Sequence, residues 1–176
     1  MAKTKSFELK YLKTIGIMNN GSNGRGFSNP VDIELSKDGR IFVLNRCHAN
    51  QSLNAIRIGI CNIDEEYLGE FGHGRFVLPT DMAFDGQDNI HVADEHTHKI
   101  SVFDSSGKYL RTWGEYGSGN GQFNGPSGLV FNSNDCLYVV DQHNNRIQKF
   151  TGEGEYLLQW GQEGNNYGEF NMPWGI

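Results

Sequence analysis

The chain has 176 residues and a formal net charge of −6, from 15 Lys and Arg against 21 Asp and Glu. This length suits a single domain, and the acidic balance argues against binding nucleic acid or anionic lipid over the whole surface, which requires many cationic side chains. Because no segment has the roughly 18 apolar residues that span a bilayer, and no secretory leader is recognised, we expect a cytoplasmic protein without a membrane segment.

A short sequence signature recurs along the chain. The first element is Tyr11-Leu-Lys-Thr-Ile-Gly16, a copy of the motif that closes each later unit. The pattern Phe-x-x-Pro then begins at Phe27, Phe76, Phe123 and Phe170, with spacings of 49, 47 and 47 residues. A nearly fixed period of this length predicts a repeat architecture.

Each unit contains four short runs rich in β-branched and aromatic residues, separated by Gly, Asn, Asp and Ser clusters. Such clusters form tight turns between antiparallel strands, and no segment has a sustained helical period. A four-stranded unit that repeats must stack on its neighbours, as the blades of an all-β propeller do. We predict a single partial β-propeller over residues 1–176, with about three blades of four antiparallel strands: a lone outer strand (7–16), blade 1 (27–72), blade 2 (76–114), blade 3 (123–161) and the start of blade 4 (170–176).

The third unit resembles the NHL repeat family. The motifs that carry the resemblance are Asp141-x-x-Asn144-x-Arg146-Ile147 after the second strand, Gly121-Gln122-Phe123-x-x-Pro126 at the blade junction and Trp160-Gly161 at the blade end. The resemblance covers residues 7–176 and implies a ring of usually six blades. Six blades at this period need about 280 residues, so the chain corresponds to roughly half a ring.

The sequence stops at Pro173-Trp-Gly-Ile176, within the first strand of a fourth unit. We expect a fragment of a longer protein, because such an end leaves a strand unpaired and a blade face open. Two alternatives remain: a homodimer of two half-rings, and an open arc of three blades.

Two acidic residues lie at the start of the innermost strands. Asp32 and Asp81 occupy equivalent positions after Pro-x, where the backbone approaches the ring axis. Adjacent carboxylates could bind a cation or a cationic ligand, since they provide hard oxygen ligands. We favour the alternative, in which these carboxylates cap backbone amides at the entrance of the strands.

In two blades an aspartate precedes a cationic residue by five positions, across the loop after the second strand. The pairs are Asp94 with Lys99 and Asp141 with Arg146. We predict that both are structural ion pairs that shape the loops rather than ligand-binding groups. Blade 1 has Asn45 in place of the aspartate.

Three histidines on the same loops, His96, His98 and His143, are candidate zinc ligands. A zinc site needs at least three ligands at about 2 Å from the metal. We favour exposed loop histidines and no metal or cofactor, with zinc or calcium as the alternative.

Two functions are compatible with these features. The first is a non-catalytic scaffold that binds a protein or a small ligand through one loop face, as the NHL resemblance implies. Nucleic acid is not an expected partner, because Arg146 and Lys99 are assigned to ion pairs. The second, implied by a resemblance to propeller enzymes, is a metal-dependent lyase or lactonase-like hydrolase whose site is completed by missing blades or by dimerisation. Its metal ligands would come from Asp32, Asp81, His96 and His143.

Overall fold

The computed structural model describes residues 10–16, 26–47 and 55–176. In these ranges the chain folds into three four-stranded antiparallel sheets, each with its strands in chain order, as predicted from the repeat. We call these sheets blade 1, blade 2 and blade 3. Their strands are β1 (Pro30–Leu35), β2 (Ile41–Asn45), β3 (Arg57–Cys61), β4 (Tyr67–Phe71), β5 (Pro79–Phe84), β6 (Ile90–Asp94), β7 (Lys99–Phe103), β8 (Tyr109–Trp113), β9 (Pro126–Phe131), β10 (Cys136–Asp141), β11 (Arg146–Thr151) and β12 (Tyr156–Trp160).

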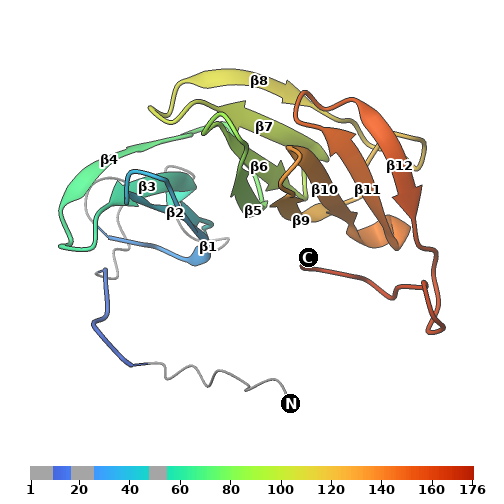
Figure 1. The fold of residues 1–176 in the computed structure, drawn as a ribbon, viewed down its shortest axis with the longest axis horizontal. Helices are drawn as coiled ribbons and strands as arrows, with labels where there is room; N and C mark the ends of the chain where they lie inside the picture. The colour runs from blue at the N-terminus through green and yellow to red at the C-terminus, as the bar shows by residue number, and fades with distance from the viewer. Residues whose placement is uncertain (1–9, 17–25, 48–54) are drawn as a thin grey trace, which may run out of the picture.

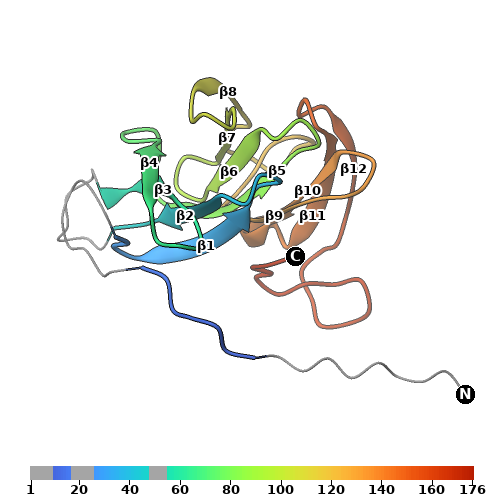
Figure 2. The ribbon, with the colours of Figure 1, turned by 60° about the vertical axis from the view of Figure 1, so that its left-hand side comes forward.

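The blades stand side by side along an arc, with the first strand of each on the inner side and the fourth on the outer side (Figures 1 and 2). Contacts between blades run mainly through the inner strands, β1 with β5 and β5 with β9. Such stacking is required because both faces of a blade carry apolar side chains that must be covered. The structure is therefore a partial β-propeller.

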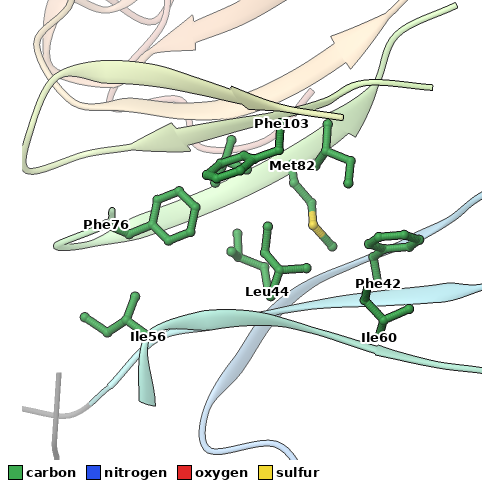
Figure 3. Close-up of a cluster of buried hydrophobic side chains, with 10 residues drawn as sticks. Phe42, Leu44, Ile56, Ile60, Phe76, Met82 and Phe103 are labelled. Atoms are coloured by element: carbon green, nitrogen blue, oxygen red, sulfur yellow. The ribbon is translucent and has the colours of Figure 1, made fainter. Parts of the chain in front are cut away.

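The core between blades 1 and 2 is built from both sheets (Figure 3). Blade 1 contributes Phe42 and Leu44, and blade 2 contributes Met82 and Phe103, all at most 1% exposed. A second core between blades 2 and 3 has the buried ring of Phe123 near its centre. Burial of these side chains stabilises the contact between blades, at about 25 cal/mol for each Å² of apolar surface removed from water.

One glycine contact repeats at every blade end. The Phe-x-x-Pro phenylalanine packs against the glycine that closes the preceding unit, so that an added Cβ would lie 2.5 to 2.8 Å from the ring. These glycines also have positive φ angles, which side chains disfavour. The glycine–phenylalanine pairs are Gly16–Phe27, Gly72–Phe76, Gly114–Phe123 and Gly161–Phe170.

The two ends of the arc differ from the sequence prediction. The outer strand predicted over residues 7–16 is absent from residues 10–16, the described part of that segment. Residues 171–176 also form no strand, although a Cβ on Gly128 would lie 2.9 Å from the carbonyl oxygen of Trp174. Ile15 packs against blade 1 and Trp174 lies beside Gly128, but most of both segments is exposed, and a strand needs a neighbouring backbone with which to form a hydrogen-bonded ladder.

The helical content is small. The short 3-10 helix Gln142–Asn144 lies in the β10–β11 loop. Within the described ranges there is no helix with the length and apolarity that crossing a bilayer requires.

Candidate functional site

The loops after the second strand of each blade lie beside the blade junctions at one end of the molecule. The backbone N–H of Arg46 donates to Asn29, that of Glu95 donates to Leu78, and that of Gln142 donates to Gly125. These equivalent bonds bring Arg46, which follows β2, and the β6–β7 and β10–β11 loops together with the Phe-x-x-Pro segments. We call this end of the molecule the loop face.

In blade 3 a buried ion pair holds the loop face. The Asp141 carboxylate lies 2.7 Å from Nε of Arg146, and both side chains are at most 7% exposed. Asp141 also accepts a hydrogen bond from the backbone N–H of Asn124. Arg146 donates to the carbonyl oxygens of Ser118 and Gly119 in the blade junction. The pair therefore fixes two loops at once and has no donor directed at solvent.

Blade 2 corrects the prediction of an Asp94–Lys99 ion pair. Although the two residues are register partners, no ion pair joins them, and Lys99 is exposed. The Asp94 carboxylate instead accepts hydrogen bonds from four backbone N–H groups, those of Val77, Leu78, His96 and Thr97. Four amides satisfy a buried carboxylate without a cation, which leaves the ammonium group free to remain hydrated.

Blade 1 places the counter-ion elsewhere. Asn45 occupies the aspartate position and accepts a hydrogen bond from Ser28. Arg57, whose side chain is 1% exposed, forms its ion pair with Glu70 of β4, at 2.8 Å. Glu70 was not among the predicted site residues. The signal that could have found it is the replacement of Thr112 and Gln159, at the same position in blades 2 and 3, by an acidic residue.

Asp32 and Asp81 join neighbouring inner strands. Both carboxylates accept a hydrogen bond from the backbone N–H of Met82, at 2.8 and 3.0 Å, and Asp81 also accepts one from Leu129. Burial and the hydrogen bond with Asp32 raise the pKa of Asp81 to about 8. The two carboxylates, on the concave side of the arc, therefore link the inner strands of neighbouring blades by hydrogen bonds.

The three predicted histidines lie on the loop face but do not converge. His98 accepts a hydrogen bond from the backbone N–H of Gly125 at 3.1 Å, and its ring packs on Tyr116. His143 lies 4.0 Å from Glu95, and His96 is exposed. Among the described residues no group of three His, Cys, Asp or Glu side chains could hold a metal ion.

The position of His98 also sets its protonation. Burial first, and then the neighbouring His96 and His143, lower the pKa of His98. The hydrogen bond from Gly125 requires an unprotonated Nδ1, which agrees with a neutral ring. His98 therefore supports the junction between blades 2 and 3 rather than offering a charge to solvent.

Sequence reasoning missed the most exposed aromatic residue beside these histidines. Tyr116, in the junction between blades 2 and 3, is 67% exposed and lies against the His98 ring at a centroid distance of 4.8 Å. On the same face, Glu95 lies 3.6 Å from Arg46 and 4.0 Å from His143. The loop face thus carries an exposed aromatic side chain together with side chains of both charges.

The sequence is similar to known proteins over limited segments. The NHL repeat family matches residues 123–150, which include β10, β11 and the Asp141–Arg146 loop. "Protein brain tumor" of Drosophila melanogaster is 40% identical over 52 residues, 28% of this chain and 5% of that protein. "B-box type zinc finger protein ncl-1" of Caenorhabditis elegans is 46% identical over 44 residues, 24% of this chain and 5% of that protein.

The fold is similar to solved propeller structures. A streptogramin B lyase structure superimposes with a TM-score of 0.63 at 17% sequence identity, over 85% of this chain and 45% of the lyase chain. At this identity the similarity concerns the fold alone. The chain spans less than half the length of this structural relative.

Proposed function

We propose that this chain, in which NHL repeats build a partial β-propeller, is a non-catalytic scaffold that binds a protein partner through its loop face. The observation that carries the proposal is that the buried charged groups of the loops are already bonded within the protein. Asp94 is fully engaged by backbone amides, and Asp141 and Arg146 by each other and by the junction. These buried groups position the loops. A partner would therefore contact the exposed side chains of the loop face.

The side chains above the loop bases have the composition of a protein-binding surface. Tyr116 is a rigid, exposed aromatic residue, a type that often contributes a large share of binding energy at interfaces. Arg46, Glu95 and His143 add ionisable side chains of both charges to the same face. Exposed aromatic side chains together with polar ones are common at protein interfaces, which favours a protein over a small ligand here.

Nucleic acid fits this surface less well. The net charge is −6, and Arg146 is buried in an ion pair, so few cations remain to displace the counterions of a phosphate backbone. Lys99 is an exposed cation on this face. An isolated lysine supplies little of the affinity that a protein gains from a cluster of phosphate contacts.

The metal-dependent enzyme has no specific observation in its favour among the described residues. Its proposed ligands lie in two separate places, with Asp32 and Asp81 at the inner strands and His96 and His143 on the loop face. The structural similarity to the lyase supports the fold and gives no residue of this chain a catalytic role. We therefore propose the scaffold alone.

Site-directed photo-crosslinking tests the proposal. Tyr116 is replaced by p-benzoylphenylalanine, and the chain is irradiated in an extract of the cells that produce it. The matched control carries the same residue at Ser133, which is exposed in the β9–β10 turn at the opposite end of blade 3. We expect a discrete crosslinked protein from position 116 that is absent from position 133.

The competition arm uses the unlabelled chain. An excess of wild-type protein should remove the adduct, and an excess of the Tyr116→Ala variant should remove it at least tenfold less effectively. Adducts of equal yield from both positions, or no adduct from position 116, would contradict binding through the loop face.

A further inference from the structure

Blade 1 contains a cavity beside its third and fourth strands. The cavity has a volume of about 150 Å³ and lies between β3, β4 and the segments 15–16 and 26–27. Its apolar wall includes Ile15, Phe27 and Cys61. Its polar wall includes Tyr67 and the Arg57–Glu70 ion pair.

In blades 2 and 3 a phenylalanine ring fills the equivalent space. Phe103 opposes Tyr109 in the β7–β8 ladder, and Phe150 opposes Tyr156 in the β11–β12 ladder. The Phe103 ring lies 5.2 to 5.8 Å from the rings of Phe71, Phe76 and Tyr109. An aromatic side chain at this position is thus enclosed by three other rings.

Phe150 has the corresponding neighbours in blade 3. Its ring lies 4.9 Å from Trp113, 5.6 Å from Phe123 and 6.1 Å from Tyr156. Ring pairs at these distances stabilise each other beyond the burial of their surface. In blades 2 and 3 the space beside the third strand is therefore filled by a phenylalanine ring packed among other aromatic rings.

Blade 1 retains part of this enclosure and lacks the central ring. Cys61 opposes Tyr67 in the same register and occupies the Phe103 and Phe150 position. Ile15 stands where the other blades have Phe71 and Trp113, and both Ile15 and Phe27 pack against the core that contains Cys61. The missing ring leaves the cavity.

A second replacement enlarges the space. Gly59 of β3 opposes Glu70, as Ser101 opposes Thr112 and Gln148 opposes Gln159. A Cβ added at Gly59 would lie 3.7 Å from the Phe27 ring, which is an ordinary contact. The glycine is therefore not required by crowding, and its missing side chain adds to the free volume.

We propose that this cavity is a binding site for a small molecule with a single aromatic ring and a hydrogen-bond donor, such as a phenol. A cavity of about 150 Å³ with one apolar wall is large enough for a ring of the size of benzene. The donor would face the Glu70 carboxylate, whose Oε1 accepts a hydrogen bond from His73 Nε2 at 3.2 Å and whose Oε2 lies 2.8 Å from Arg57 Nε in the ion pair but accepts no hydrogen bond from the described residues. A carboxylate has lone pairs for further donors.

The surroundings of the cavity favour a neutral, non-covalent ligand. Burial, together with Glu65, raises the pKa of the Cys61 thiol, which keeps the sulfur a poor nucleophile. Burial and then Glu70 raise the pKa of the Tyr67 hydroxyl. The site is on the side of blade 1 that faces away from blade 2, so the proposal does not depend on binding through the loop face.

The probe for this site is phenol, titrated into the full chain and followed by calorimetry and by the shift in Tm. We expect saturable binding and a rise in Tm with concentration, since a ligand that binds only the folded state stabilises it. Cys61→Phe places the missing ring in the cavity. This variant should bind phenol at least tenfold more weakly and should have a higher Tm than the wild type without ligand.

Two further variants keep the test decisive. Gly59→Ser introduces the side chain found in blade 2 and should also weaken binding, which covers the case in which Cys61→Phe fails to fold. Cys136→Ser changes a cysteine in blade 3 and should bind phenol like the wild type. The proposal would be overturned if the wild type showed no saturable binding of phenol. It would also be overturned if folded Cys61→Phe and Gly59→Ser bound phenol as tightly as the wild type does.

Discussion

Asp141 and Arg146 form a buried ion pair at 2.7 Å, whereas Lys99, which stands at the position of Arg146 in blade 2, is exposed and lies in no ion pair with Asp94. Two blades with the same sequence spacing thus fix the same loop in different ways. In blade 3 a guanidinium group bridges the loop and the junction, and in blade 2 the aspartate does so alone through backbone amides.

This difference predicts unequal effects of equivalent substitutions. Arg146→Ala should lower the free energy of unfolding by about 3–5 kcal/mol, because it leaves the buried Asp141 without its cation. Lys99→Ala should change it by less than about 0.5 kcal/mol, as exposed substitutions do. Urea denaturation of both variants measures the effects, and equal losses would contradict the assignment of the pair as structural.

The contact between Gly114 and Phe123 predicts a second pair of effects. Gly114 and Gly121 both have positive φ, so alanine at either position costs about 1–2 kcal/mol. At Gly114 the added Cβ would also lie 2.8 Å from the Phe123 ring and 3.2 Å from the His98 carbonyl oxygen, whereas at Gly121 it meets nothing within 4 Å. Thermal denaturation should show a clearly larger loss for Gly114→Ala, and a larger loss for Gly121→Ala would contradict the contact.

The contact between the Asp32 and Asp81 carboxyl groups predicts a pH dependence of stability. The pKa of Asp81 is about 8 in the folded chain, against an ordinary value of 3.8, so the folded state binds more protons than the unfolded state between these values. The contribution of Asp81 to stability is therefore full below about pH 4 and is lost as the pH rises towards about 8, which lowers the free energy of unfolding by at least about 1.4 kcal/mol.

Removing the titrating group isolates this effect. Asp81→Asn should flatten the fall between about pH 5 and pH 8, because the amide cannot ionise. Denaturant titrations of the wild type and the variant in the same buffers measure the slopes. The prediction is contradicted by identical slopes in the two proteins.

The two tryptophans that close blades 2 and 3 have different neighbours. Trp113 packs on Phe123 and Phe150 of the next blade, whereas Trp160 packs on Tyr138 of its own blade and is 39% exposed. Trp113→Ala should cost about 3–5 kcal/mol and Trp160→Ala about half as much. Guanidinium denaturation measures both, and similar losses would contradict the difference in packing.

Much of the fold follows from the repeat. The Phe-x-x-Pro spacing and the turn clusters predict three four-stranded blades in the correct order, since turns and alternation fix antiparallel ladders. The terminal segments were predicted less well. Residues 10–16 match the motif of a closing strand, but a strand requires a neighbouring strand, which sequence similarity within a segment does not supply.

The site was predicted in part. The pattern that indicates Asp141–Arg146 also indicates Asp94–Lys99, yet only loop geometry decides whether amides or a cation satisfy the carboxylate. Glu70 lies 13 residues from Arg57, and only the ladder register brings them together. Tyr116 lies in the glycine-rich junction between blades 2 and 3, and its exposure comes from the folded arrangement.

The most direct test of binding through the loop face is hydrogen exchange of the chain with and without the protein captured from position 116. We expect slower exchange in residues 95–98 and 114–125 when the partner is bound, and no change in residues 132–136 at the opposite end of blade 3. Slower exchange confined to residues 132–136, with the loop face unchanged, would contradict the account.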